Sequence, residues 1–337
     1  MTNRPKLTIS LLTWNGAHYL PLLLKSLTEQ TFQDWELLVL DNASDDESIA
    51  TIKEHYPPAK VIQQKMNLGF AKGHNLIINW SKSDYILFLN QDLMLAPNYL
   101  EDAIAFLEKN PNVASVSGKL LYWDFEQSNT TKIIDSFGLK MHRNRKVIDW
   151  QQGKKDYDPA VKLDQDAVEV FGLSATALLV RRAALEVVKL PKNNNQFEYF
   201  DEDFFSYKED IDLAWRFRLA GYENWLVTST VAYHHRSVSK LKATRADRQS
   251  RGIANKLSYR NHLATLYKNS FASNIWRDLF YILWYEFKKI IYFIIFERKT
   301  LKGFKEFLKL KNKLKKKRKY IKKNRKTNPE DIRNWWK

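Results

Sequence analysis

Short apolar runs alternate with helix-like stretches along the first part of the chain. The strongest β-rich runs are Leu7–Leu12, Trp35–Leu40 and Tyr85–Leu89, and a weaker one covers Val61–Gln63. Apolar runs of strand length, separated by longer segments with helical spacing, are typical of strand–helix–strand units. The pattern therefore predicts an α/β fold with a largely parallel sheet flanked by helices.

Polar side chains follow each of the three strong runs. The first run leads into residues 13–15, the second into residues 41–45 and the third into residues 90–92. Ligands of open α/β sheets bind beyond the carboxyl ends of the strands. We therefore expect these three loops to line one crevice.

Asp92 is a candidate metal ligand in the third loop. Hard cations such as Mg²⁺ and Mn²⁺ favour oxygen ligands and commonly join one or two protein carboxylates to a diphosphate. A carboxylate at the end of a buried strand is well placed for this task. The alternative is an aspartate that starts a turn or caps the next helix.

Two further segments are candidates for nucleotide contacts. Asp41 and Asp45 precede a predicted helix at residues 49–55, where they could accept hydrogen bonds from a base or ribose. An ordinary strand–turn–helix connection explains the same residues. Residues 67–75 contain two glycines that would let the backbone approach a ligand, but their spacing matches neither phosphate-binding glycine fingerprint.

Carboxylates crowd the start of a helix that we predict from Ile211 to Ala220, with Gly221 as its stop. Acidic residues in a first turn are favoured by the helix dipole, which explains some of them. Glu209 and Asp210 add more acid than capping needs. One carboxylate aimed into the crevice could remove a proton from an acceptor hydroxyl.

His234 and His235 end a short apolar strand that begins at Val231. Adjacent strand residues point to opposite sides, so only one imidazole would face the crevice. A histidine alone is more often structural than a ligand, and this pair gains weight only beside Asp92.

Composition limits the chemistry. The chain has no cysteine, so disulfides, cysteine nucleophiles and thiolate metal sites are excluded, and any metal is held by oxygen and imidazole.

A length of 337 residues with 44% hydrophobic content allows one full core plus an appendage. The first apolar run is only strand-sized, so no signal peptide is predicted. We interpret the polar, aromatic segment Leu121–Ala160 as an irregular surface excursion.

The net charge of +17 is concentrated near the end of the chain. Residues 297–327 contain 16 Lys/Arg and two Glu, so they carry +14 and the other 306 residues only +3. The preceding segment Leu279–Phe296 is rich in aromatic residues and isoleucine, but Glu286, Lys288 and Lys289 interrupt it, which excludes a clean bilayer span. We predict an amphipathic anchor on an anionic membrane surface. The alternative is a helical bundle followed by a solvated basic tail.

The ordered set of motifs resembles the inverting family-two glycosyltransferases of GT-A fold, especially their bacterial rhamnosyltransferase-like members. The resemblance covers residues 7–269, and each motif is modest alone. It depends on residues 13–15, 41–45, 67–70, 90–92, 209–216, 221–222 and 234–235.

The resemblance implies roles for individual residues. Asp210, with Glu209 beside it, would be the catalytic base. Asp92 and His234 would hold Mg²⁺ or Mn²⁺, with His235 as the second choice for the histidine ligand. The residues implied in nucleotide binding are Thr13, Asn15, Asp41, Asp45, Gly69, Asn75 and Asn90, the last standing where the family often has an aspartate.

The resemblance also implies a function. A catalytic domain of residues 1–270 would transfer a hexose, rhamnose among the candidates, from a dTDP- or UDP-linked donor to a glycan or lipid-linked glycan acceptor. This is the chemistry of cell-envelope polysaccharide and O-antigen biosynthesis. By its own charge and aromatic content, the extension 271–337 would hold the enzyme in the cytoplasm at the inner face of the cell membrane.

Two other functions compete with this interpretation. One is a nucleic-acid-binding protein that uses the basic tail, and the other is a catalytically inactive nucleotide-binding scaffold. The positive charge is segregated at the end of the chain while the core carries acidic loops, so no nucleic acid partner is expected. Retention of Asp92, Asp210 and His234 argues against an inactive scaffold.

Overall fold

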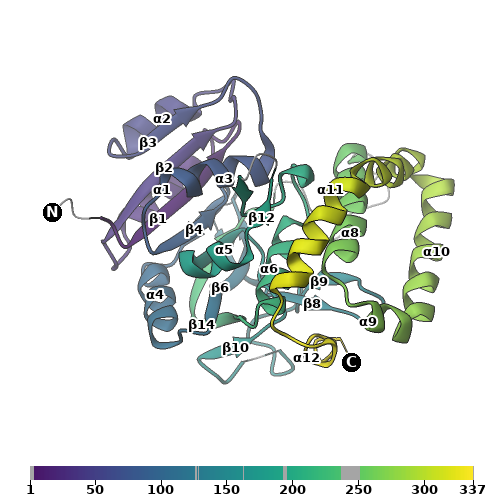
Figure 1. Cartoon of the computed structure of the whole chain (residues 1–337). Helices are drawn as coiled ribbons and strands as arrows, with labels where there is room; N and C mark the ends of the chain where they lie inside the picture. Colours follow the sequence, from purple (N-terminus) through teal and green to yellow (C-terminus); the bar gives the residue numbers. More distant parts are fainter. Residues whose placement is uncertain are drawn as a thin grey trace.

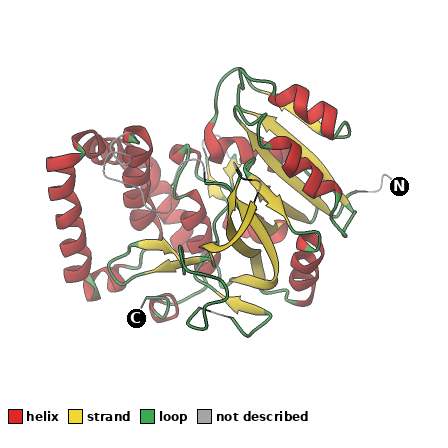
Figure 2. Ribbon diagram, turned by 180° about the vertical axis from the view of Figure 1, so that it is seen from behind, coloured by secondary structure: helices red, strands yellow, loops and turns green. Residues whose placement is uncertain are grey.

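The computed structural model describes residues 4–125, 127, 129–161, 163–192, 196–236 and 251–336. A central sheet lies between two layers of helices, and the C-terminal helices gather at one end of the molecule (Figures 1 and 2). Along the main path the strand order is β10-β14-β6-β11-β4-β1-β2-β3. The sheet is mixed and mostly parallel along this path, as the apolar pattern predicts.

The first half of the chain forms the parallel part of the sheet. Strand β1 pairs in parallel with β2 and β4, and β2 pairs in parallel with β3. The helices between the strands cross over the faces of the sheet, as βαβ units require. These elements are β1 (Leu7–Thr13), α1 (Leu20–Thr28), β2 (Trp35–Asp41), α2 (Ser48–His55), β3 (Lys60–Gln63), α3 (Gly69–Trp80) and β4 (Tyr85–Leu89).

The second half of the sheet contains antiparallel pairings. Strand β11 lies antiparallel between β4 and β6, whereas the long strand β14 runs parallel to β6 and also pairs with β5 and β10. The elements are β5 (Leu93–Leu95), α4 (Tyr99–Lys109), β6 (Val113–Asp124), β7 (Asn129–Ser136), β8 (Leu139–Met141), β9 (Val147–Asp149), β10 (Ala167–Glu169), β11 (Ala177–Arg181), α5 (Arg182–Val188), β12 (Leu190–Pro191), β13 (Phe197–Glu198), the 3-10 turn η1 (Glu202–Phe204), α6 (Glu209–Leu219) and β14 (Glu223–His234).

The interpretation of Leu121–Ala160 as an irregular surface excursion is wrong. The segment completes β6, and its strand β7 pairs with β6 in the main sheet. Ile134 and Phe137 are fully buried, and so is Asp135. Two of its charged residues, Asp135 and Arg145, face the interior, where they are ion-paired with Arg236 and Asp278 respectively.

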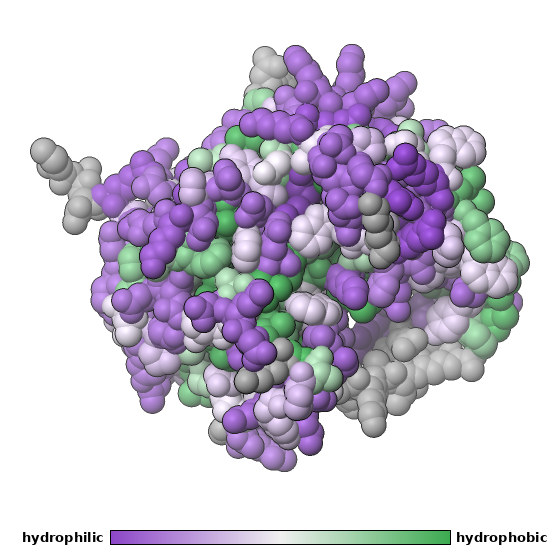
Figure 3. Space-filling model, turned by 90° about the horizontal axis from the view of Figure 1, so that it is seen from below, coloured by the Kyte–Doolittle hydropathy of each residue, from purple (hydrophilic) through white to green (hydrophobic). Residues whose placement is uncertain are grey.

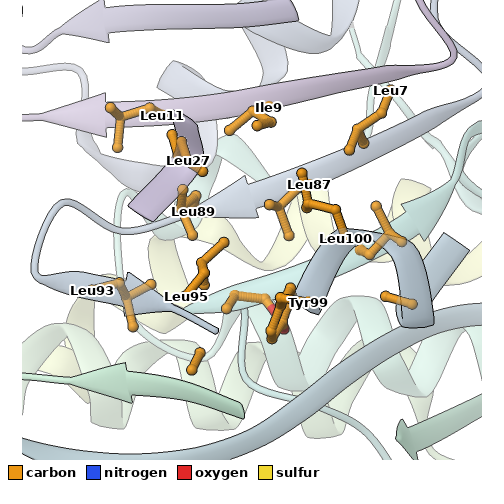
Figure 4. Packing of buried hydrophobic residues seen from close by; sticks show 14 of the residues in the cluster. Leu7, Ile9, Leu11, Leu27, Leu87, Leu89, Leu93, Leu95, Tyr99 and Leu100 are labelled. Carbon is orange, nitrogen blue, oxygen red and sulfur yellow. The ribbon is translucent and has the colours of Figure 1, made fainter. Parts of the chain in front are cut away.

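Both faces of β1, β2 and β4 are largely buried, which explains why their sequences are mostly apolar. On one face Leu7 and Ile9 of β1 and Leu87 of β4 pack with Tyr99 and Leu100 of α4 (Figure 4). On the other face the alternate residues of β4 pack against α3, α5 and α6. Each strand therefore joins two cores.

The chain ends in a set of helices that packs against the sheet domain. The basic helix α11 lies along α8, and Ile321, Ile332 and Trp336 share a core with Trp215 and Leu139. The extension is thus helical, as predicted, and part of it is buried. These elements are α8 (Gly252–Asn269), α9 (Ala272–Arg277), α10 (Leu279–Phe296), the 3-10 turn η2 (Arg298–Leu301), α11 (Lys302–Asn324) and α12 (Pro329–Arg333).

The expected division at residues 270/271 falls in the short break between α8 and α9. Of the helices that the structure describes, none combines the length and apolar character needed to cross a bilayer. Residues 237–250, which the expected domain 1–270 includes, lie outside the described residues.

Candidate active site

The loops after β1, β2 and β4 are joined by side-chain hydrogen bonds, as expected of loops that line one crevice. Thr13 Oγ1 and the Trp14 amide both donate to Gln91 Oε1, each at 2.9 Å. The amide of Asp45 donates to Asn15 Oδ1 at 3.0 Å. The predicted nucleotide contacts at the ends of β1 and β2 are therefore neighbours in space.

Asp41 is buried under its own loop. Its carboxylate accepts the amide of Ser44 at 3.1 Å and the hydroxyl of Ser44 at 2.5 Å, and the side chain has no exposed surface. Asp45, by contrast, is exposed on the same loop. The pair thus offers one fixed and one free carboxylate beside Asn15.

Gly69 and Asn75 are both buried and contact the segment of residues 199–205. Gly69 has φ +76°, and a Cβ at this position would lie 2.6 Å from the Phe205 carbonyl oxygen, so the backbone conformation and packing require glycine. Asn75 is 2% exposed. Its Oδ1 accepts the amides of Tyr199 and Phe200, and its Nδ2 donates to the Phe200 carbonyl, so it holds a neighbouring segment.

Five of the predicted site residues line a single cavity of about 580 Å³. It lies where the end of β4, the end of β14 and the start of α6 meet. A larger cavity of about 1040 Å³ lies beside α11, but it contains none of the predicted residues, and three of its lysines are ion-paired with acidic residues. The five residues of the smaller cavity are Asn90, Asp92, Glu209, Asp210 and His234.

His234 faces Asp92 across this cavity. Its Nε2 lies 3.5 Å from Asp92 Oδ1, and its Nδ1 lies 2.8 Å from Asp135 Oδ2. Burial disfavours the charged ring, but Asp92 and Asp135 outweigh this and raise the pKa of His234 to about 9. His235 points the other way, with its ring 5.5 Å from that of Tyr19. Only one imidazole faces the cavity, as strand alternation predicts.

The donor set at Asp92 and His234 fits a divalent cation. No group of three or more His, Asp or Glu side chains is arranged around a common metal position in the part of the chain that the structure describes. A cation that binds a diphosphate needs only one or two protein ligands. The contact of Asp135 with Nδ1 leaves Nε2 directed at Asp92, an arrangement common for metal-binding histidines.

Sequence reasoning missed three charged residues at this site. Arg236 forms ion pairs with Asp135 at 2.5 Å and with Asp149 at 2.9 Å, and Asp149 and Arg236 line the cavity. Burial opposes the charge of Arg236, but both aspartates raise its pKa. Its position next to the histidine pair was an available signal, whereas both aspartates lie in the segment interpreted as surface.

Glu209 and Asp210 begin α6 at the opposite side of the cavity. Glu209 is 7% exposed, and its Oε2 has no hydrogen-bond partner among the described residues. Burial, together with the charge of Asp210, raises the pKa of Glu209 to about 8. Burial also raises the pKa of Asp210 above its ordinary value. Asp212 is instead paired with Arg216 at 3.0 Å inside the fold. The site therefore contains two carboxyl groups of raised pKa across the cavity from a candidate metal position.

The chain is similar in fold and in sequence to known glycosyltransferases. In fold the chain is similar to GalNAc-T7 solved with UDP, GalNAc and Mn²⁺ (TM-score 0.58, 12% identity, 80% of this chain and 48% of that chain). It is also similar to residues 1–349 of TarS from S. aureus (TM-score 0.55, 17% identity, 98% of this chain and 89% of that chain). The fold is of GT-A type. The sequence model of glycosyl transferase family 2 matches residues 8–186, and the chain belongs to this family.

Proteins that are similar to this chain in sequence are also named as glycosyltransferases. A glycosyltransferase of Haemophilus influenzae is 33% identical over 32% of this chain and 36% of its own length. The UDP-Glc:alpha-D-GlcNAc-diphosphoundecaprenol beta-1,3-glucosyltransferase WfgD of Escherichia coli is 27% identical over 37% of this chain and 47% of its length. N-acetylglucosaminyl-diphospho-decaprenol L-rhamnosyltransferase of Mycobacterium tuberculosis is 23% identical over 69% of this chain and 77% of its length. The first two matches span less than half of these relatives.

Proposed function

We propose that this protein is an inverting, metal-dependent glycosyltransferase that moves a sugar from a nucleotide-diphosphate donor to a glycan acceptor. The observation that carries the proposal is the cavity in which Asp92 and His234 lie opposite Glu209 and Asp210. One side of the cavity has the ligands for a cation and the other side has a base of raised pKa. This is the pair of functions that displacement of a nucleoside diphosphate needs.

The proposed reaction is one in-line displacement. Asp210 takes the proton of the acceptor hydroxyl as the acceptor oxygen bonds to the anomeric carbon. The bond from that carbon to the phosphate oxygen breaks, and its electron pair leaves with the diphosphate, so the anomeric configuration inverts. A divalent cation held by Asp92 and His234 would neutralise charge on the leaving group. Because its raised pKa keeps Glu209 protonated near neutral pH, we assign the role of base to Asp210.

The donor would lie along the ends of the parallel strands. We assign its nucleotide to the adjacent loops of β1 and β2, and the ribose or diphosphate to Asn90 at the end of β4. The shared hydrogen bonds of these loops support one continuous binding surface. UDP- and dTDP-linked donors, rhamnose among the sugars, are both compatible with relatives named for UDP-Glc and L-rhamnose. The proposed contacts are Asn15, Asp45 and Asn90, and the buried side chains of Thr13 and Asp41 would hold the loops that carry them.

The acceptor is proposed to be a lipid-linked glycan of cell-envelope polysaccharide assembly, O-antigen included. Two relatives are named for acceptors on diphosphoundecaprenol and diphospho-decaprenol. Such acceptors reside in a membrane, so the enzyme would work in the cytoplasm at the inner membrane face. We keep the division into a catalytic part, 1–270, and a membrane-associating part, 271–337, as a proposal.

The surface of α9 and α10 supports membrane association. Helix α10 stands at the outer edge of the molecule, away from the sheet, and apolar side chains gather there (Figures 1 and 3). Exposed cationic residues, Lys288, Arg298 and Lys299 among them, lie on or directly after α10. An apolar face beside basic residues matches the interface of an anionic bilayer. The exposed apolar residues are Trp276, Phe280, Tyr281, Leu283, Trp284, Phe287, Ile290, Ile291, Ile294 and Ile295.

Asp210→Asn tests the catalytic assignment. The substitution keeps the shape of the side chain but removes the base, so we expect diphosphate release to fall by about 10²-fold or more. The measurement is release of UDP or dTDP from UDP-glucose, UDP-N-acetylglucosamine and dTDP-rhamnose, with Mn²⁺ and a lipid-linked glycan extract. Donor affinity is the control and is expected to stay unchanged. A variant that turns over as fast as the parent would remove Asp210 from the mechanism.

A further inference from the structure

The backbone just before the candidate base adopts a conformation that side chains disfavour. Phe205, Tyr207 and Lys208 have φ values of 63°, 74° and 71°, all in the region of positive φ. Non-glycine residues avoid this region, and a run of them persists only where the surroundings fix it. Asp210 follows directly in the first turn of α6. The position of the base therefore depends on whatever holds residues 204–208.

One side chain of α8 holds this loop. Asn261 is fully buried, and its Nδ2 donates to the carbonyl oxygens of Phe204 at 3.0 Å, Ser206 at 2.9 Å and Tyr207 at 2.7 Å. Its Oδ1 accepts from Arg260 Nε at 2.9 Å. Carbonyls only accept and a guanidinium only donates, so these partners allow a single orientation of the amide.

Other residues of α8 also bind the segment around Asp210. Arg260 Nη2 donates to the carbonyls of Asp203 at 2.7 Å and Phe204 at 2.8 Å. About two turns further along α8, Lys268 and Asn269 contact the carboxylate of Asp212 in the first turn of α6, each at 2.9 Å. Helix α8 thus fixes the chain on both sides of Asp210.

We propose that Asn261 is a positioning residue for the transfer reaction. It acts through the backbone of residues 204–208 to direct Asp210 at the acceptor hydroxyl, and it touches neither donor nor acceptor. This role rests on the proposed function. The donor contacts lie on the loops of β1, β2 and β4, so loss of Asn261 lowers kcat and leaves donor binding intact.

Asn261→Ala tests the role, with Asn255→Ala as the matched control. Asn255 lies on the same helix and its amide donates to Glu297 at 3.0 Å, away from the loop. The first readout is hydrogen exchange of residues 204–212 in the full chain. The second is the kcat and donor KM for diphosphate release from the nucleotide-sugars named above.

For Asn261→Ala we expect exchange about tenfold or more faster in residues 204–212, with the rest of the protein unchanged. The kcat falls by about tenfold or more while donor KM stays within about twofold of the parent. Asn255→Ala changes neither quantity. If Asn261→Ala does not fold, Asn261→Gln, which displaces the donor group by one methylene, takes its place in both assays.

Unchanged exchange, or faster exchange with unchanged kcat, overturns the proposal. Faster exchange throughout the molecule with kcat and KM changed together does so as well, because it indicates general destabilisation. A parent protein that turns over no nucleotide-sugar contradicts the proposed function instead. The exchange readout then still decides whether Asn261 holds the loop.

Discussion

Glu209 is a carboxyl group whose protonation depends on folding. It lies in the first turn of α6, almost completely buried, next to Asp210. Burial and that neighbouring charge raise its pKa from an ordinary value of 4.5 to about 8. At neutral pH the folded protein therefore binds a proton here that the unfolded chain has released.

This difference makes stability depend on pH. Below pH 4.5 both states hold the proton and the contribution is fully present; as pH rises from 4.5 to about 8 it is lost, by up to about 1.4 kcal/mol per pH unit. Glu209→Gln removes the titrating group. We expect urea unfolding at pH 5 and pH 8 to show a smaller loss of stability in the variant than in the parent. Equal losses would contradict the buried, protonated state of Glu209.

Some candidate site residues can be predicted because a local sequence pattern marks them. Asp92 follows an apolar strand, and strand alternation singles out one imidazole of the pair at residues 234 and 235. Asp135 and Asp149 carry no such signal, because they lie in a polar segment and reach the site through ion pairs with residues of the distant strand end at 234–236. The packing of Phe205 against Gly69 carries no local signal either, because the two residues lie far apart in the chain.

Among the elements, α11 shows how a basic segment becomes part of a fold. Lys317 is 5% exposed and forms ion pairs with Glu198 at 2.6 Å, Asp201 at 2.5 Å and Asp203 at 3.0 Å. Helical spacing predicts the helix, but a lysine run usually indicates a solvated face. The docking was not predictable, because its acidic partners lie more than 100 residues earlier in the chain.

Helix α10 has the opposite character, and its apolar face tests the membrane proposal. Trp284 and Phe287 are more than half exposed, and burial of such a side chain contributes about 1.5–3 kcal/mol. We expect Trp284→Glu and Phe287→Glu each to weaken binding to anionic vesicles by about tenfold or more in co-sedimentation. Met66→Glu, an exposed apolar residue elsewhere, is the control. Binding that is unchanged in both variants would rule out this face as the anchor, and equal binding to neutral vesicles would rule out the preference for anionic lipid.

At the scale of the whole molecule, the parallel half of the sheet follows from local apolar runs and helical spacing. The antiparallel half does not follow from local patterns. Strand β11 pairs with β6, which is not its neighbour in the sequence, and β7 lies in a polar segment. The two halves meet at β4, and the end of this strand holds Asp92. The candidate site thus depends equally on the predictable and the unpredictable part of the fold.

The most direct test of the central claim is calorimetric titration of UDP and dTDP into the purified protein with Mn²⁺, with Mg²⁺ and with chelator. The parent and Asp92→Ala are compared, with Asp84→Ala, at the opposite end of β4, as control. The account predicts that one of the nucleotides binds at least about tenfold more tightly with metal, and that Asp92→Ala alone abolishes this gain. Absence of nucleotide binding with either metal, or equal metal-dependent binding by Asp92→Ala, would contradict it.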